Sequence, residues 1–369
     1  MRPGVPEILL NPGRRHDRVV ERPEVLPARF HRRLPGYVPT RVVNAPELAA
    51  QLGLTTLHVK DESHRLGLPS FKILGASWAV YRLLVGRLGR EPQWQTFDEL
   101  RGALAPLGPL TLVAATDGNH GRAVAHMAKQ LGYHARILVP AGTAAARIDG
   151  IRSEGASVIV EDGTYDDAVR ASAALAADDV LVVSDTSWEG YTDVPKTVIE
   201  GYSTIFAEVD EQLADTPPEV VVVPMGVGAL AAATVSHYSS RSTIIVVEPL
   251  SAACGLRSAQ AGHPVEVPGP HDSIMAGLNC GMVSIIAWPA VSRGADAFVA
   301  VDDAAAEDAM RDLDTIGVVA GETGAASLAG LRAVTEAGTP DVSGRHVLVL
   351  CTEGATDPVA YERIVGHAP

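Results

Sequence analysis

Short runs typical of strands alternate along this 369-residue chain with longer segments in which apolar residues recur at helical spacing. The predicted strands are residues 56–60, 112–115, 135–139, 157–160, 180–183, 220–223, 244–247, 298–301 and 347–351. The predicted helices are residues 45–52, 73–84, 122–131, 144–154, 165–176, 303–315 and 324–337, and a further helix starts at Gly228. Strands alternating with helices of about ten residues are typical of parallel βαβ units. We therefore expect an α/β protein with open, largely parallel sheets flanked by helices.

Two segments lack this rhythm. Residues 1–36 are rich in Arg and Pro, and we expect an extended arm lying over the body. Residues 87–109 are interrupted by Pro and Gly, which favours an irregular excursion between lobes. The length predicts two domains. We expect a large discontinuous domain, residues 1–88 with 200–369, and a small mobile domain, residues 89–199.

Composition narrows the possible partners. The net charge is −14 and there is no dense Lys/Arg block, so nucleic acid and anionic membranes are not expected partners. The three cysteines have no CxxC spacing, which argues against a zinc site or a disulfide framework. Without a leader-like segment or about 18 consecutive apolar residues, the chain is expected to be a soluble cytoplasmic protein.

Lys72 is the first residue with candidate chemistry. Gly67 and Pro69 predict a turn, and Ser70 is a possible N-cap for the helix that follows. Lys72 would then lie in the first helical turn among apolar groups, where both the helix dipole and burial disfavour an ammonium. A lysine that forms an imine needs this, since its ordinary pKa is about 10.4. The alternative is a surface lysine at the start of an amphipathic helix.

In parallel α/β folds, ligands bind beyond the carboxyl ends of the strands. After residues 112–115, Asp117 is a candidate acid or base, and the Asn119 amide can donate to a phenolate-like oxygen; an Asx-type turn is the alternative. After residues 220–223, a loop with two glycines, residues 224–230, leads into a helix. We call it the glycine loop, and it predicts an anion site. Its spacing is neither GxGxxG nor a P-loop, so it suits a monophosphate.

Two further strand ends carry polar residues. Thr352 follows residues 347–351, and its hydroxyl can donate to or accept from a ring nitrogen. A plain N-cap is the alternative. Asp185 follows residues 180–183 beside aromatic residues and is a candidate base, or part of a connecting turn. A lysine, a phosphate cradle, an amide donor and a hydroxyl together meet the requirements of pyridoxal phosphate.

These motifs resemble those of the tryptophan-synthase-β-like, fold-type-II pyridoxal-phosphate enzymes, and more narrowly the diaminopropionate ammonia-lyase family. The resemblance covers residues 35–365. Its most specific mark is Asp117, where serine and threonine dehydratases usually carry Ser, followed by the Trp-Glu-Gly-Tyr run at 188–191. The segments that carry it are 59–63, 70–72, 115–121, 185–191, 226–229, 248–249, 275–281 and 352–358.

The resemblance implies a role for each of these residues. Lys72 is the Schiff-base lysine, Asn119 the partner of the 3′-oxygen, and Thr352 the neighbour of the pyridine nitrogen. Asp117 and Asp185 are bases on opposite faces, so that both enantiomers react. The phosphate is held by Gly226, Val227, Gly228, Ala229 and Leu230. The implied reaction is α,β-elimination of 2,3-diaminopropionate to pyruvate and two ammonia by a homodimer whose large domain binds the cofactor.

Departures from the family pattern keep alternatives open. Pro69 precedes the lysine motif, Ala229 stands where Ser is usual, and Ala355 stands where the family tends to have Asp. The same fold and cofactor could therefore serve a serine/threonine dehydratase or a β-replacement enzyme. A non-catalytic ligand-binding protein retaining the fold is the alternative from another class.

Cys254 and Cys280 occupy places where this family often has cysteines near a flap, and we expect them reduced.

Overall fold

The computed structural model describes residues 4–15, 27–116, 118–163 and 165–369. Contacts divide the chain into two compact units. Unit 1 comprises Met1–Glu24, Pro39–His64 and Ile205–Pro369, and unit 2 comprises Val25–Val38 and Arg65–Thr204. The predicted domains differ from this division mainly over residues 25–38 and 65–88, because helix α3 packs on α5 of unit 2. The mobility of a small domain stays a prediction.

Unit 1 is built on a seven-stranded sheet with the order β1-β10-β9-β8-β11-β3-β2. The five inner strands are parallel, and β1 and β2 pair antiparallel at the two edges. The strands are β1 Glu7–Leu10, β2 Val42–Asn44, β3 Thr56–Asp61, β8 Val220–Pro224, β9 Thr243–Pro249, β10 Ala297–Val301 and β11 His346–Cys351. The predicted parallel architecture is confirmed in this unit.

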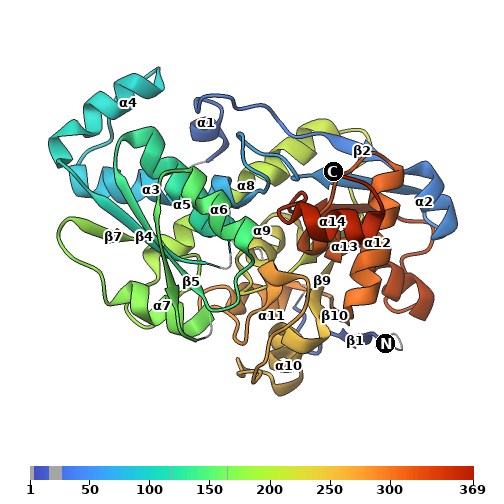
Figure 1. Cartoon of the computed structure of the whole chain (residues 1–369). Coiled ribbons are helices and arrows are strands. Elements are labelled where there is room, and N and C mark those ends of the chain that lie inside the picture. The colour runs from blue at the N-terminus through green and yellow to red at the C-terminus, as the bar shows by residue number, and fades with distance from the viewer. Residues whose placement is uncertain (1–3, 16–26, 117, 164) are drawn as a thin grey trace. The chain divides into compact units, whose positions relative to one another are not determined.

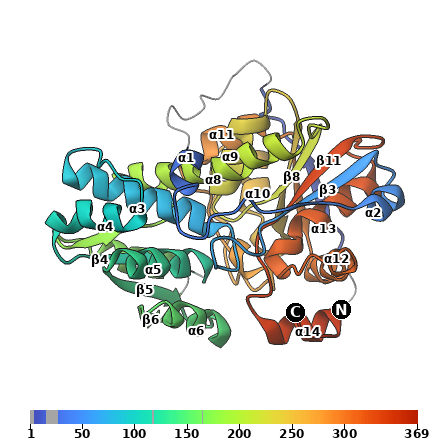
Figure 2. The same ribbon diagram turned by 90° about the horizontal axis from the view of Figure 1, so that it is seen from above.

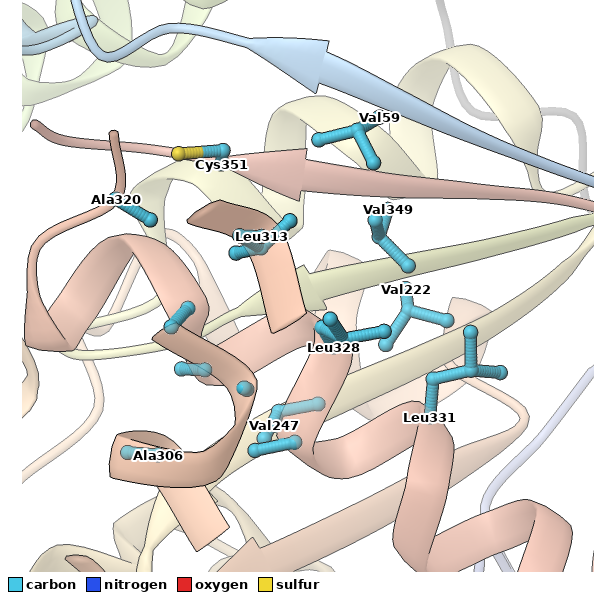
Figure 3. Packing of buried hydrophobic residues seen from close by; sticks show 14 of the residues in the cluster. Val59, Val222, Val247, Ala306, Leu313, Ala320, Leu328, Leu331, Val349 and Cys351 are labelled. Carbon is cyan, nitrogen blue, oxygen red and sulfur yellow. The ribbon is translucent and has the colours of Figure 1, made fainter. Parts of the chain in front are cut away.

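Helices cover both faces of this sheet, which is why β8 and β10 are apolar and buried at every position. Alternate residues such as Val222, Val247 and Val349 point toward Leu328 and Leu331 of α13 (Figure 3). The other alternate residues are also buried, and α9 packs on β8 and β9. Figure 2 shows α12 and α13 side by side next to β3 and β11. The helices are α2 Pro46–Gln51, α9 Ala229–Tyr238, α10 Cys254–Ala261, α11 Trp288–Gly294, α12 Asp303–Thr315, α13 Glu322–Ala337 and α14 Pro358–Val365.

Unit 2 contains a four-stranded parallel sheet with the order β6-β5-β4-β7. Helices α5 and α7 pack against β4 and β5, as Figure 1 shows. The strands are β4 Thr111–Ala115, β5 His134–Pro140, β6 Ser157–Glu161 and β7 Val180–Val182. The helices are α1 Ala28–His31, α3 Lys72–Leu88, α4 Phe97–Leu104, α5 Asn119–Leu131, α6 Ala145–Ser153, α7 Tyr165–Ala173 and the part of α8, Asp193–Gln212, up to Thr204.

Three local expectations were wrong. The N-terminal arm is not simply extended, because β1 adds an edge strand to the sheet of unit 1. The segment predicted as irregular contains α4, which begins with a capping box in which Thr96 accepts from the Glu99 amide. Ser70 does not cap α3, because Phe71 occupies the N-cap position. The predicted turn does exist, with Arg65 and Leu68 exchanging backbone hydrogen bonds.

Helices α3 and α8 approach so closely within unit 2 that their contact requires glycine. A Cβ on Gly75 would lie 2.5 Å from the Tyr202 ring, and a Cβ on Gly201 would lie 2.5 Å from the Leu74 carbonyl oxygen. The Tyr202 ring also packs on Phe71, with ring centroids 4.7 Å apart. The start of α3, and Lys72 with it, is therefore fixed by α8.

Candidate active site

The carboxyl ends of β4 and β7 form one edge of the sheet of unit 2. These two strands are parallel neighbours, so the loop at residues 116–121 and the loop at 183–191 leave the sheet side by side. His120 confirms this closeness, because its Nε2 lies 2.7 Å from the Val183 carbonyl oxygen. The two predicted strand-end loops of this unit therefore meet.

Lys72 is the first residue of α3 and reaches the second of these loops. Its Nζ donates a 2.7 Å hydrogen bond to Asp185 Oδ2. The Asp185 side chain is 6% exposed, whereas that of Lys72 is 19% exposed. The alternative of a surface lysine is thereby excluded, and the amine combines a buried partner with access for a ligand.

The environment of Asp185 favours its carboxylate form. Burial alone would raise the pKa of Asp185, but the charge of Lys72, the nearby His120 ring and the hydrogen bonds from Lys72 and Tyr165 outweigh it. The pKa of this carboxyl is therefore held well below its usual range. Tyr165 donates to Oδ1 at 3.2 Å, so the two oxygens of the carboxylate face different partners.

Tyr191 and Trp188 stabilise the backbone of the loop that carries Asp185. The Tyr191 hydroxyl donates to the Val182 carbonyl oxygen at 2.8 Å and accepts from the Ser184 amide at 3.1 Å. The Trp188 ring stacks on Tyr191 with centroids 4.2 Å apart. These two aromatic residues give the loop structural support, because they hold the backbone that carries the carboxylate.

Asn119 and Asp117 come from the other loop. Asn119 is the first residue of α5 and is half-buried, and the N-cap position of this helix is Gly118. Asp117 lies outside the described residues. The sequence did not single out three side chains near Asp185, namely the buried His120 and Tyr202 and the half-buried Tyr165. Only His120 had a usable signal, since it stands within the motif that supplies Asn119.

In unit 1, the glycine loop follows β8 and opens α9. Gly228 is the N-cap of α9 with a φ of +100°, a conformation that L side chains rarely adopt. No side chain caps this helix. Amide groups at an uncapped helix start are suited to an anion such as a phosphate, so the residues present fit the predicted group.

Other residues of unit 1 pack tightly against the glycine loop. A Cβ on Gly226 would lie 3.0 Å from the Gly277 carbonyl oxygen and 3.1 Å from Cys280 Sγ. The Ser284 amide donates to the Val227 carbonyl oxygen at 2.8 Å. Cys254 Sγ lies 3.8 Å from the Gly226 carbonyl oxygen. Cys254 and Cys280 are not joined by a disulfide, and burial raises the pKa of Cys254 well above its usual value.

Thr352 follows β11, which is the parallel neighbour of β8, so it emerges at the same edge of the sheet as the glycine loop. Its side chain is buried and donates to the Thr323 carbonyl oxygen at 3.4 Å. The alternative of a plain N-cap is excluded, because Asp357 caps the next helix, α14. Ala355 packs against the core of unit 1.

Each unit therefore assembles its own part of the predicted set. Unit 2 brings together Lys72, Asp185 and the loop carrying Asn119, and unit 1 brings together the glycine loop and Thr352. Over the described ranges there is no group of three or more His, Cys, Asp or Glu suited to a metal ion. No helix in the described part of the chain is long and apolar enough to cross a membrane.

Comparison with known proteins extends these observations. Residues 33–353 match the family model of pyridoxal-phosphate dependent enzymes. The chain is 36% identical over 364 residues to a diaminopropionate ammonia-lyase of Salmonella typhimurium, with 91% of this chain and 90% of that one covered. This level of identity spans both units.

Solved structures agree with this relationship. Diaminopropionate ammonia-lyase from Escherichia coli in complex with D-serine matches with a TM-score of 0.89 and 33% identity, covering 98% of this chain and 96% of that one. The same enzyme in complex with an aminoacrylate–pyridoxal-phosphate azomethine reaction intermediate matches with a TM-score of 0.87. The predicted fold type II is confirmed. The chain belongs to the pyridoxal-phosphate-dependent enzymes and, among them, to the family of the diaminopropionate ammonia-lyases.

Proposed function

We propose that this chain is a pyridoxal-phosphate-dependent ammonia-lyase that converts 2,3-diaminopropionate to pyruvate and two ammonia. The observation that carries the proposal is the Lys72–Asp185 pair, a partly accessible amine held at 2.7 Å by a buried carboxylate. Family membership supplies the cofactor and the reaction class. When bound, pyridoxal phosphate supplies an aldehyde for the lysine and a ring that accepts the electron pair left at the substrate Cα.

The cofactor-binding roles follow the predicted assignments. Lys72 provides the amine that links to the aldehyde, and the Asn119 amide donates to the ring oxygen. The Thr352 hydroxyl serves the ring nitrogen in place of a carboxylate, which leaves that nitrogen largely unprotonated. The phosphate is held by the backbone of Gly226, Val227, Gly228, Ala229 and Leu230. The uncapped start of α9 supports this last assignment.

Two carboxylates are proposed to move protons. Asp185 takes the Cα proton of one enantiomer, and its low pKa keeps it ionised and able to accept at neutral pH. Asp117 takes the proton of the other enantiomer. A second carboxylate near the substrate favours a cationic β-ammonium over the neutral hydroxyl of serine, so Asp117 also has a physical reason to select the substrate.

The test of this function is a comparison of substrates. Purified protein saturated with pyridoxal phosphate is expected to release pyruvate from D- and L-2,3-diaminopropionate, and much less from serine or threonine. Lys72→Ala is expected to lose the absorbance near the visible edge that marks covalently held cofactor. Faster turnover of serine would contradict the substrate assignment while leaving the cofactor in place.

A second function on the same cofactor is favoured by one residue. Ala355 replaces the Asp that is usual in the family, at the end of the loop that carries Thr352. This removes a carboxylate from the region of the ring and favours a dehydratase or β-replacement enzyme acting on another amino acid. A panel of amino acids scored for pyruvate and 2-oxobutanoate separates the two functions.

The remaining assignments are also proposals. The Lys72–Asp185 pair argues against a non-catalytic binding protein, because it combines a partly accessible amine with a buried carboxylate 2.7 Å away. A cofactor-saturated protein that exchanges no Cα proton with any amino acid would favour that alternative. We infer a homodimer located in the cytoplasm, and light scattering of the purified protein tests the oligomeric state.

A further inference from the structure

A buried histidine lies close to Asp185 within unit 2. His120, on α5, is 1% exposed, and its Nδ1 lies 4.0 Å from Asp185 Oδ2. The same carboxylate oxygen accepts the 2.7 Å hydrogen bond from Lys72 Nζ. One oxygen atom therefore faces an amine and an imidazole within unit 2.

The surroundings of His120 fix which of its ring nitrogens can take a proton. Nε2 lies 2.7 Å from the Val183 carbonyl oxygen, and a carbonyl only accepts, so Nε2 carries the hydrogen. Nδ1 is buried and has no hydrogen-bond partner within the described part of the chain. In the neutral ring, Nδ1 therefore presents an electron pair toward the carboxylate and is the position where a proton would be accepted.

A lysine that is to attack an aldehyde must first lose a proton. An ammonium has an ordinary pKa of about 10.4, so it gives up this proton reluctantly near neutral pH. The nearest acceptor is Asp185 Oδ2. The pKa of Asp185 is held well below its usual range, despite burial, by Lys72, His120 and Tyr165, so this carboxyl passes a proton on rather than keeping it.

We propose that Lys72, Asp185 and His120 form a proton relay that prepares the lysine to bind the cofactor. Lys72 Nζ gives a proton to Asp185 Oδ2, and Oδ2 gives a proton to His120 Nδ1. The ammonium becomes an amine with a free electron pair, the carboxylate is restored, and the imidazole becomes an imidazolium. No proton enters or leaves the three groups.

The second transfer requires a small movement. Proton transfer takes place at about 2.6–3.2 Å, so Oδ2 and Nδ1 must approach by about 1 Å from their separation of 4.0 Å. Once the proton has moved, a neutral Lys72 and a neutral Asp185 carboxyl no longer attract each other as ions, whereas a ring held at Nε2 by Val183 stays in place. Rotation of the Asp185 side chain toward His120 then closes the distance.

Three tyrosines near Asp185 leave the relay undisturbed. Tyr165 donates to Oδ1 at 3.2 Å, so Oδ2 is left to Lys72 and His120. Burial raises the pKa of Tyr191 and of Tyr202 above the usual value, so both phenols keep their protons. Asp117 lies outside the described residues.

The variant His120→Gln separates proton acceptance from structural support. Its amide nitrogen can still donate to the Val183 carbonyl oxygen, but the amide cannot take up a proton. The matched control is His126→Gln on the same helix, where the ring Nδ1 lies 3.1 Å from Glu154 Oε2, away from the relay. The relay rests on the proposed function, because it prepares the lysine for pyridoxal phosphate.

The measurement is the rate at which apoprotein links pyridoxal phosphate, followed by stopped-flow absorbance between pH 6.5 and 9. Wild type and His126→Gln are expected to show a nearly flat rate. In His120→Gln the lysine must release its proton to solvent, so the rate is expected to fall roughly tenfold per pH unit as pH decreases. An unchanged pH profile in His120→Gln overturns the relay. A wild type that links no cofactor overturns the proposed function itself.

A second measurement needs no substitution. Nitrogen-15 NMR of histidine-labelled wild type is expected to show one imidazole gaining a proton at Nδ1 when pyridoxal phosphate is added at pH 7.5. If the cofactor links to Lys72 and no histidine changes its protonation state, the relay is wrong, and the lyase assignment stands.

Discussion

Lys60 and Lys72 each form a 2.7 Å ion pair with a buried carboxylate, and their surroundings give them different roles. Lys60 is fully buried, and its Nζ donates to Glu208 Oε2 at 2.7 Å, the Thr40 carbonyl oxygen at 2.8 Å and Gln212 Oε1 at 2.9 Å. An ammonium with three acceptors and no access to solvent has no way to reach a ligand. Lys72 keeps part of its side chain exposed. Exposure, rather than the presence of a carboxylate, separates the lysine proposed to react from the structural one.

The Lys60–Glu208 pair gives a prediction of stability. Lys60→Met leaves the buried Glu208 carboxylate without its counter-charge, and removing one partner of a buried pair costs about 3–5 kcal/mol. We expect the free energy of unfolding in urea to fall by that amount. The double variant Lys60→Met/Glu208→Leu is expected to recover most of the loss. A single variant within about 1 kcal/mol of wild type would show that water reaches the pair.

At the scale of elements, the crossing of α3 and α8 determines where Lys72 lies. Side chains of ordinary size would separate the two helices, but Gly75 and Gly201 allow backbone and ring to touch. Tyr202 fills the space above Gly75 and packs on Phe71, the residue before the lysine. A change in this crossing would therefore move the amine relative to Asp185.

Two glycines of α3 provide a matched test. Gly75→Ala places a methyl group 2.5 Å from the Tyr202 ring, and overpacking of this kind costs about 1–3 kcal/mol. Gly86→Ala on the same helix meets nothing within 4 Å and is expected to stabilise by about 0.5–1 kcal/mol, since alanine favours the helix. Thermal unfolding of both variants checks the two signs. Equal effects would mean that the crossing relaxes freely.

Elements with strong patterns were predictable from the sequence, and weakly patterned ones were not. The four strands of unit 2 and the five parallel strands of unit 1 follow from apolar runs, and α12 follows from its helical spacing with Asp302 as its cap. Helix α4 was missed because surrounding Pro and Gly residues concealed the capping box of Thr96 and Glu99. The edge strand β1 pairs with β10, which lies far along the chain, and a local sequence pattern does not predict a pairing over such a distance.

At the scale of the whole molecule, the residues proposed to hold pyridoxal phosphate belong to both units. Strand-end loops could be located from the sequence, because parallel strands direct their carboxyl ends to one edge. The partners of Asp185 could not, since Tyr165 and His120 reach it from helices that the sequence does not place side by side. Motifs identify the residues that contact a ligand, whereas the groups that tune them depend on tertiary packing.

Removal of the cofactor is expected to destabilise both units. A ligand at 100 times its dissociation constant stabilises the folded state by about 2.7 kcal/mol. Hydrogen exchange of apoprotein and loaded protein, read separately at β8 of unit 1 and β4 of unit 2, is expected to show added protection in both. Protection confined to one unit would contradict the proposed division of the binding residues.

The pairing of distant strands also constrains how the chain is made. On a ribosome, β1 and β3 emerge early, but their partners β10 and β11 end at Val301 and Cys351. The sheet of unit 1 therefore cannot be completed until synthesis is almost finished, and β1 and β3 lack these partners until then. The sheet of unit 2 runs from Thr111 to Val182 and has all its strands much sooner. Lys72 and Asp185 would thus be brought together while residues 226–230, the loop proposed to hold the phosphate, are still being translated.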